Sequence, residues 1–337
     1  MNPSGPPPHA RDSSASTTVP PLFGPYGGAA LREAEALVRG GADACWFHGF
    51  DPACFEACAK HGLAACVEFK TFRADFAAHP ELIPTGADGG PIRFGRLVQG
   101  VCLSRREFTE KIERDLLAGI RACRPAGVWL DYLSGAGWFE TPRPDLQESC
   151  FCDACVAEFC QATGIDADRP AEILARHADR WRRHACQRIA RFGARYAELI
   201  RAHLPGCVVG AYMCPWRPEE FDGALTRIFA QDYDLLAGAI DVFTPLIYAR
   251  KSGRSADWGR RFLDGAGDFV PAGRKVQLIL DVLDFPHSLL AAAESATPTW
   301  GVQVFGGAEI FTDPARGKTF RAAADRIRQA VASSGRR

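Results

Sequence analysis

The sequence lacks a long apolar run and an excess of charge of either sign. No uninterrupted apolar stretch approaches the ~18 residues that predict a membrane-spanning helix, so we expect no membrane partner. The 40 Lys and Arg residues balance 40 Asp and Glu residues, and therefore nothing favours nucleic acid as a partner. No Gly-x-Gly-x-x-Gly turn follows an early predicted strand, which argues against a dinucleotide or another organic cofactor.

The N-terminal region also lacks the apolar core of a secretion signal. Proline, serine and threonine dominate it, so we predict a disordered arm over residues 1–20, one folded domain over 21–335, and a cytoplasmic location. The chain contains 13 cysteines. In a cytoplasmic protein this number predicts mostly free, buried thiols and one metal cluster rather than disulfides.

Short apolar runs alternate with longer amphipathic stretches along the 337 residues. The predicted strands cover 21–26, 42–48, 63–69, 127–132, 207–213, 240–248, 275–281 and part of 301–311. The predicted helices cover 52–61, 105–123, 153–203 with breaks near Gly164 and Pro170, 218–237, 256–265, 287–296 and 314–333. Eight strands alternating with helices predict an α/β fold, a single-domain (β/α)8 TIM barrel, with an open doubly wound sheet as the alternative. Long loops are expected after the third and fourth strands.

Acidic residues stand where the active site of such a barrel lies, at the carboxyl ends of the strands. Asp131 follows an apolar strand, where an ionised side chain is costly unless it is used or paired. Glu68, Asp281 and Glu140 are further catalytic candidates. Each has a structural alternative: a salt bridge or loop cap for Asp131, pairing with Lys70 or Arg73 for Glu68, a helix N-cap for Asp281, and plain exposure for Glu140.

Other polar and aromatic residues near the strand ends are candidates for binding a substrate, because tryptophans can stack on sugar faces while histidine and tyrosine offer hydrogen bonds. The substrate-binding candidates are His48, Arg73, Trp138, Tyr212, Trp216 and Tyr248.

The strongest local motif is a C-x-C-x-x-C run formed by Cys150, Cys152 and Cys155. Thiolates at this spacing suit tetrahedral zinc, which needs a fourth ligand. Cys102, just before a predicted helix, is the preferred fourth ligand; Cys160 is closer but lies further into a helix. A closed site of four thiolates would be structural, since catalytic zinc keeps an open position.

Three segments, GVCLSRREFTEKIERDLLAGI, GVWLDYLSGAGWFE and ESCFCDACVAEF, resemble the central part of glycoside-hydrolase-like TIM barrels, over roughly residues 60–260. The resemblance implies a barrel that acts on carbohydrate. The cysteine pattern is similar to that of family 42 β-galactosidases, which implies zinc on Cys102, Cys150, Cys152 and Cys155. The catalytic pair of that family does not carry over: it has Asn-Glu after strand four and Glu after strand seven, where this chain has Leu130-Asp131 and Asp281.

The leading hypothesis is therefore a glycoside hydrolase with a two-carboxylate mechanism and an oligosaccharide or glycoside as substrate. In it Asp131 is the nucleophile or base, and Glu68 is the first choice for the acid, ahead of Glu140 and Asp281. A non-catalytic carbohydrate-binding barrel and a lyase or isomerase using a divalent metal are the alternatives. A homo-oligomer is compatible with the sequence.

Overall fold

A computed structural model describes residues 20–334. The expected arm over 1–20 thus lies outside the described residues, apart from Pro20. The strands are β1 (Phe23–Tyr26), β2 (Ala44–His48), β3 (Ala64–Lys70), β4 (Gly127–Asp131), β5 (Val208–Met213), β6 (Val242–Ile247), β7 (Lys275–Val276), β8 (Leu278–Asp281) and β9 (Val302–Phe305). All their pairings are parallel.

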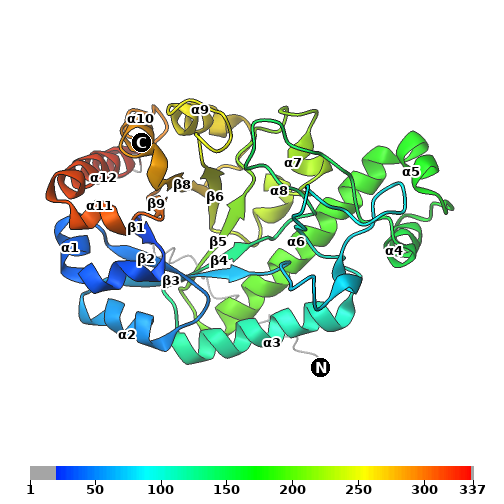
Figure 1. Ribbon diagram of the computed structural model, residues 1–337, viewed down its shortest axis with the longest axis horizontal. Helices are drawn as coiled ribbons and strands as arrows, with labels where there is room; N and C mark the ends of the chain where they lie inside the picture. The colour runs from blue at the N-terminus through cyan, green and yellow to red at the C-terminus, as the bar shows by residue number, and fades with distance from the viewer. Residues whose placement is uncertain (1–19, 335–337) are drawn as a thin grey trace, which may run out of the picture.

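The strands form a closed barrel (Figure 1). Their order is β5-β4-β3-β2-β1-β9-β8-β6-β7, and an additional pairing of β5 with β6 closes the ring. Strands β7 and β8 are two parts of one barrel strand that is interrupted at Gln277. Counted in this way, the barrel has eight strands. The predicted (β/α)8 TIM barrel is therefore confirmed.

Helices surround the barrel (Figure 1). The α-helices are α1 (Ala34–Arg39), α2 (Pro52–Lys60), α3 (Arg106–Cys123), α4 (Asp153–Thr163), α5 (Pro170–Arg176), α6 (Ala178–His203), α7 (Ala224–Arg227), α8 (Tyr233–Leu236), α9 (Trp258–Gly265), α10 (His287–Ala292), α11 (Ala308–Thr312) and α12 (Pro314–Ser334). Four 3-10 helices are η1 (Gly28–Glu33), η2 (Pro80–Leu82), η3 (Ala266–Asp268) and η4 (Val282–Asp284).

The helix predicted over 218–237 is wrong. Only the short helices α7 and α8 form there, because the backbone enters the left-handed region repeatedly: φ is 51° at Phe221, 57° at Asp222, 71° at Gly223 and 50° at Ala230. These turns let Gln231 enter the interior, where it is 2% exposed and its Oε1 accepts a hydrogen bond from the Cys214 N–H at 2.7 Å. The segment therefore follows the strand ends instead of covering the barrel as one helix.

Large aromatic side chains fill the inside of the barrel. The rings of Trp46 and Trp129 meet edge to face at 5.4 Å, and Trp129 Nε1 donates to Thr244 Oγ1 at 2.8 Å. Glycine at position 210 makes room for this packing, because a Cβ there would lie 2.4 Å from Trp129 Nε1. The Gln303 side-chain amide lies 2.8 Å from the Tyr212 hydroxyl and donates to it.

A small second cluster of buried residues lies beside the barrel, where α4, α5 and the start of α6 project from it (Figure 1). Phe151 stacks on Trp181 with ring centres 4.6 Å apart, and Phe159 meets the same indole edge to face. Cys102 and Cys155 belong to this cluster. It gives the long loop after β4 an apolar anchor of its own.

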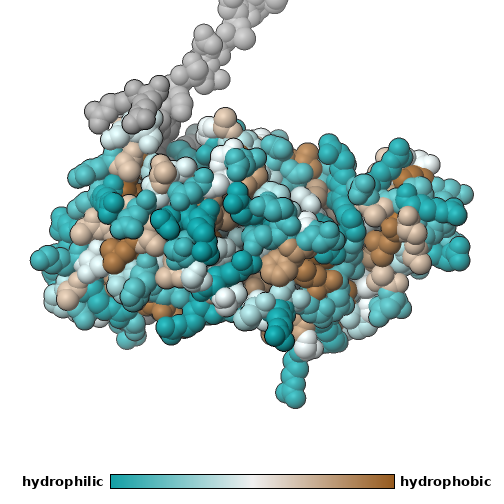
Figure 2. All heavy atoms as spheres, turned by 90° about the horizontal axis from the view of Figure 1, so that it is seen from above, coloured by the Kyte–Doolittle hydropathy of each residue, from teal (hydrophilic) through white to brown (hydrophobic). Residues whose placement is uncertain are grey.

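The outer surface is mainly hydrophilic on the face drawn in Figure 2, with hydrophobic residues scattered among the polar ones. Within residues 20–334, no helix is both long enough and apolar enough to traverse a lipid bilayer.

Candidate active site and metal centre

A pocket of 270 Å³ opens at the carboxyl ends of the barrel strands. Strands β1 to β6 and β9 contribute to it, together with the loop after β4. Among its lining residues are Tyr26, His48, Glu68, Lys70, Asp131, Tyr132, Trp138, Phe139, Glu140, Tyr212, Gln231 and Phe305. Six of the predicted site residues thus share one pocket, and three of these six are carboxylates.

Glu68 and Asp131 form a hydrogen-bonded carboxyl pair on neighbouring strands. Strands β3 and β4 bring them together because Lys70 of β3 is in register with Asp131 at the end of β4. The Glu68 side chain is only 3% exposed. Two carboxylates that touch cannot both be ionised at low cost, so one proton is retained between them.

The groups around Glu68 and Asp131 determine which of the two carboxyls keeps that proton. Burial and the adjacent Glu68 carboxyl raise the pKa of Asp131 well above its usual range. Burial also opposes ionisation of Glu68, but hydrogen bonds with His48, Asp131 and Tyr26 outweigh it and lower the pKa of Glu68 to about 2. Both shifts favour retention of the shared proton on Asp131 beside an ionised Glu68.

His48 at the end of β2 supports the ionised form of Glu68. Its Nδ1 lies 2.5 Å from Glu68 Oε2 and 3.1 Å from the Tyr26 hydroxyl, while half of its side chain remains exposed, at 52%. The Lys70 ammonium adds a positive charge 3.8 Å from Glu68 Oε1. The sequence-based alternative for Glu68, pairing with Lys70, is thus present alongside its place in the pocket.

Tyr132, directly after Asp131, holds an uncommon backbone conformation for a residue with a side chain, with φ of 54°. Such conformations cost energy and occur often at functional sites. Here the turn ends β4 immediately after the Asp131 carboxyl and places Tyr132 in the pocket wall near Trp138. Both rings offer flat apolar surface beside the carboxyl pair.

A second acidic group lies across the loop after β4. Glu140 lines the pocket with its side chain 20% exposed, and Lys251 Nζ lies 3.7 Å from its Oε2. Burial raises the pKa of Glu140, while the Lys251 charge lowers it. Asp281 does not line the pocket. It is 3% exposed, its Oδ2 is 2.8 Å from Lys251 Nζ, and its Oδ1 caps η4 through the Leu283 N–H.

Three predicted substrate-binding residues are placed outside the pocket lining. The Arg73 guanidinium lies over the rings of Phe76 and Tyr132, at 5.6 and 5.9 Å from their centres. Trp216 is 1% exposed and packs on Phe229. Tyr248 is 4% exposed and lies beneath the Lys251 ammonium.

Sequence reasoning missed Tyr26, Phe305 and Lys251. Tyr26 ends β1 and Phe305 ends β9, so the rule of strand ends that selects Asp131 also applies to both. Lys251 lies four residues beyond the end of β6 at Ile247, in the turn after that strand, where the rule of strand ends does not apply.

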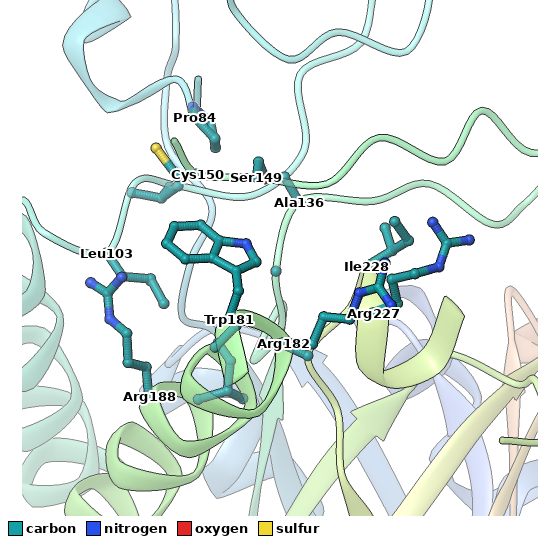
Figure 3. A pocket seen from close by; sticks show the side chains of 15 residues that line it. Pro84, Leu103, Ala136, Ser149, Cys150, Trp181, Arg182, Arg188, Arg227 and Ile228 are labelled. Atoms are coloured by element: carbon teal, nitrogen blue, oxygen red, sulfur yellow. The ribbon is translucent and has the colours of Figure 1, made fainter. Parts of the chain in front are cut away.

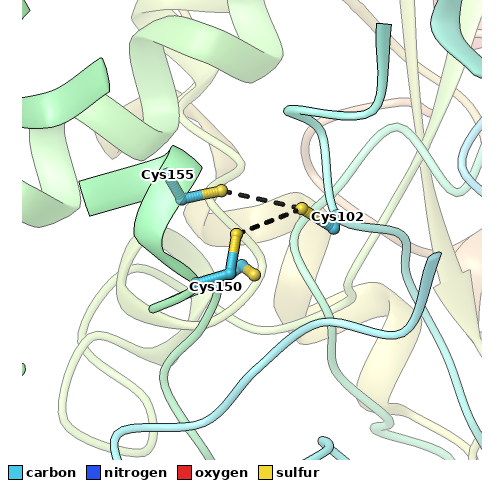
Figure 4. A group of neighbouring side chains, drawn as sticks. Cys102, Cys150 and Cys155 are labelled. Atoms are coloured by element: carbon cyan, nitrogen blue, oxygen red, sulfur yellow. Dashed lines mark hydrogen bonds between the residues drawn. The ribbon is translucent and has the colours of Figure 1, made fainter. Parts of the chain in front are cut away.

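The four predicted metal ligands come together (Figure 4). The sulfur atoms of Cys102, Cys150, Cys152 and Cys155 all lie within 4.8 Å of one another. Cys102 Sγ is 3.6 Å from Cys152 Sγ and 3.8 Å from Cys155 Sγ. This group can hold a metal ion. Cys160, the alternative fourth ligand, points elsewhere and its thiol donates to the Ala167 carbonyl at 3.1 Å.

Polar groups around the cluster are arranged to stabilise negatively charged sulfur. The Thr85 N–H donates to Cys150 Sγ at 3.2 Å, and Arg188 Nη1 lies 3.5 Å from Cys155 Sγ. Hydrogen bonds from Cys102 and Cys150 lower the pKa of Cys152 to about 6. All 13 cysteines lie in the described part of the chain, and each is a free thiol.

A small cavity lies beside Cys150, between the loop after β4 and helix α6 (Figure 3). Trp181, Arg182 and Arg188 are among its lining residues, but its volume is 40 Å³. That is room for a few water molecules and too little for a sugar. The pocket at the strand ends is therefore the candidate active site, and the cysteine cluster lies apart from it.

Several solved structures share this architecture. The PgaB (BpsB) glycoside hydrolase domain from Bordetella bronchiseptica matches with a TM-score of 0.71 at 10% identity, covering 91% of this chain and 99% of that one. A β-galactosidase from the Antarctic haloarchaeon Halorubrum lacusprofundi matches at 0.61, with 16% identity and 92% coverage of this chain. A catalytic mutant of Gan42B, a GH42 β-galactosidase from G. stearothermophilus, matches at 0.63, with 11% identity and 93% coverage.

The chain spans 58% and 57% of the length of these two β-galactosidases. At such low identities the likeness shows the fold, and it confirms the expected resemblance to glycoside-hydrolase TIM barrels at that level. No protein-family model and no curated protein matches the sequence.

Proposed function

We propose that this protein is a glycoside hydrolase in which Asp131 is the general acid. The observation that carries the proposal is the carboxyl pair in the strand-end pocket, where the hydrogen bonds around Glu68 favour its ionisation and burial favours the protonated form of Asp131. A carboxyl that stays protonated at neutral pH is what protonation of a glycosidic oxygen requires. The neighbours of similar fold are glycoside hydrolases, which makes a carbohydrate the first substrate class to test.

In the proposed reaction the Asp131 carboxyl donates its proton to the leaving oxygen while the bond from that oxygen to the anomeric carbon breaks. Positive charge then develops on the sugar ring. Glu140 is the second carboxylate, and it either activates a water molecule or attacks the anomeric carbon. Glu68, held by His48 and Tyr26, keeps the proton on Asp131 before the reaction.

This assignment reverses the roles expected from the sequence, in which Asp131 is the nucleophile or base and Glu68 the acid. The electrostatics support the reversal, because Glu68 has the lower pKa of the two. Direct contact also argues against the Glu68–Asp131 pair flanking one bond, since paired catalytic carboxyls stand about 5 Å or more apart. Glu140, on another segment of the pocket wall, is the better partner for Asp131.

A screen of oligosaccharides and aryl glycosides, read by product release, tests the proposal. We expect Asp131→Asn and Glu140→Gln each to lower kcat by about 10²-fold to 10⁴-fold on the best substrate. Asp166→Asn on the exposed surface is the matched control and should retain full activity. Full activity of Asp131→Asn would refute the role of Asp131. Binding of sugars without hydrolysis would favour a carbohydrate-binding barrel.

A metal-dependent lyase or isomerase has less support. Such an enzyme needs three or more ligands of one ion at the strand ends. Within residues 20–334, the one group of three or more His, Cys, Asp or Glu side chains with that geometry is the cysteine cluster.

For that cluster we propose a structural zinc ion. Sulfur atoms about 2.3 Å from a tetrahedral zinc stand about 3.8 Å apart, and the separations of 3.6 and 3.8 Å around Cys102 fit this value. Zinc would join the loop before α3, through Cys102, to the loop after β4 and the start of α4, through Cys150, Cys152 and Cys155. Four thiolates leave no open position, so the ion would hold loops in place rather than take part in the reaction.

A further inference from the structure

Lys251 connects two acidic residues that come from different parts of the barrel. Its Nζ lies 2.8 Å from Asp281 Oδ2 and 3.7 Å from Glu140 Oε2. Asp281 ends β8, Glu140 belongs to the loop after β4, and Lys251 lies in the turn after β6. The Lys251 ammonium therefore links the loop after β4, which forms part of the pocket wall, to strand β8 of the barrel.

Two aromatic rings also hold the Lys251 ammonium in position. Lys251 Nζ lies 4.8 Å from the centre of the Tyr248 ring and 5.0 Å from that of Phe305. Cation–π contacts of this kind restrict a flexible side chain. Asp281 is 4% exposed at its side chain, so the ion pair with Lys251 is shielded on that side. An ion pair held in this way is stronger than a solvated surface pair.

We propose that Lys251 is a positioning residue for catalysis, which Asp281 and two aromatic rings hold in place so that it orients Glu140 in its ionised form. The inference rests on the proposed role of Glu140 as second carboxylate. It also gives Asp281, a predicted catalytic residue, a different role, because Asp281 binds Lys251 and does not touch the substrate.

The charges around Glu140 favour this interpretation. Lys251 is the cation that stabilises the Glu140 carboxylate, while the Asp281 carboxylate disfavours it. The hydroxyls of Tyr132 and Tyr248 are the other titratable groups that sense the Glu140 charge. Without the Lys251 ammonium, burial and Asp281 would act on Glu140 unopposed, and its pKa would rise.

Two measurements on Lys251→Met and Lys251→Arg test the inference. The first is the pH titration of the Glu140 carboxyl by NMR with ¹³C-labelled glutamate, with the signal assigned through Glu140→Gln. The second is the pH profile of kcat/KM on the best substrate. Lys318→Met, an exposed lysine of α12, is the matched control. Thermal melts of each variant show whether it is folded.

We expect Lys251→Met to move the Glu140 titration and the acidic limb of the pH profile to higher pH, and to lower kcat by about tenfold to 100-fold. Lys251→Arg should restore both. An unchanged titration in Lys251→Met overturns the inference, even when that variant is less stable. If the wild type hydrolyses no glycoside, the proposed function fails, and the NMR titration alone decides whether Lys251 controls the charge of Glu140.

Discussion

At the scale of single residues, the site depends on where one proton lies. Asp131 follows the buried Trp129 and Leu130 on β4 and meets Glu68 on the adjacent strand. His48 and Tyr26 supply hydrogen bonds to Glu68, whereas the side-chain partner of Asp131 is Glu68 itself. The asymmetry in hydrogen bonding therefore makes the two carboxyl groups unequal, and it favours Asp131 as the one that keeps the proton.

Glu68→Gln tests this asymmetry through pH dependence. The variant removes the negative charge that opposes ionisation of Asp131, so the pKa of Asp131 falls. An acid that loses its proton at lower pH moves the alkaline limb of the kcat/KM profile to lower pH. We expect a loss of about tenfold or more at pH 8, with a smaller loss at pH 5. An alkaline limb that does not move would show that Glu68 does not control the proton.

Asp131→Asn tests the same proton through stability. Between the ordinary pKa of an aspartate and the raised pKa of Asp131, the folded state binds more protons than the unfolded state, so this residue lowers stability as the pH rises. Asparagine cannot ionise and removes that cost. We expect the variant to melt about 2 °C or more above the wild type at pH 8, and the difference to shrink at pH 4. A lower Tm at pH 8 would contradict a protonated Asp131.

The sequence predicts residues at the site better than it predicts their roles. Asp131, Glu68, His48 and Tyr212 each stand at or near the end of a predicted strand, and all four line the pocket. Their roles depend on contacts across strands, such as that between His48 Nδ1 and Glu68 Oε2, which no spacing along the chain reveals.

At the scale of elements, the cysteine cluster joins three segments, namely the loop before α3, the loop after β4 and the start of α4. Cys152→Ser should abolish binding of one zinc ion per chain, and Cys160→Ser is the matched control that should keep it. Metal content by mass spectrometry and Tm are the readouts, with a fall of about 5 °C or more expected for Cys152→Ser alone. Equal metal content in the two variants would rule out this cluster as the zinc site.

The interior of the barrel gives a second test at this scale. Gly210 on β5 faces the Trp129 indole, and an alanine methyl group would lie 2.4 Å from Nε1. We expect Gly210→Ala to lower the free energy of unfolding by about 1–3 kcal/mol, measured by denaturant titration. Gly238→Ala is the control, because its added Cβ would meet no atom within 4 Å. Equal stability of the two variants would contradict this packing.

Strands were easier to predict than the segments that follow them. Parallel strands buried on both faces read as apolar runs, as at β4 and β5. The segment over 218–237 resembles a helix in sequence, but it turns so that Gln231 bonds the backbone of Cys214. The left-handed backbone at Ala230 has no sequence signal of the kind that glycine gives.

At the scale of the whole molecule, the pocket exists because the chain closes on itself. Strands β1 and β9, from opposite ends of the chain, pair from Phe23 with Val302 to Tyr26 with Phe305. This pairing brings Tyr26 and Phe305 into one wall of the pocket. The alternation of strands and helices predicts that the barrel closes, but it does not predict the register in which β1 pairs with β9.

The protonation of Asp131 at neutral pH is the claim on which the proposed chemistry depends. Isotope-edited infrared spectroscopy with ¹³C-labelled aspartate measures it directly in the intact protein. We expect the wild type at pH 7 to show the band of a protonated aspartic acid, and Asp131→Asn to lose it, while Asp166→Asn keeps it. Absence of that band from the wild type at pH 7 would contradict the account.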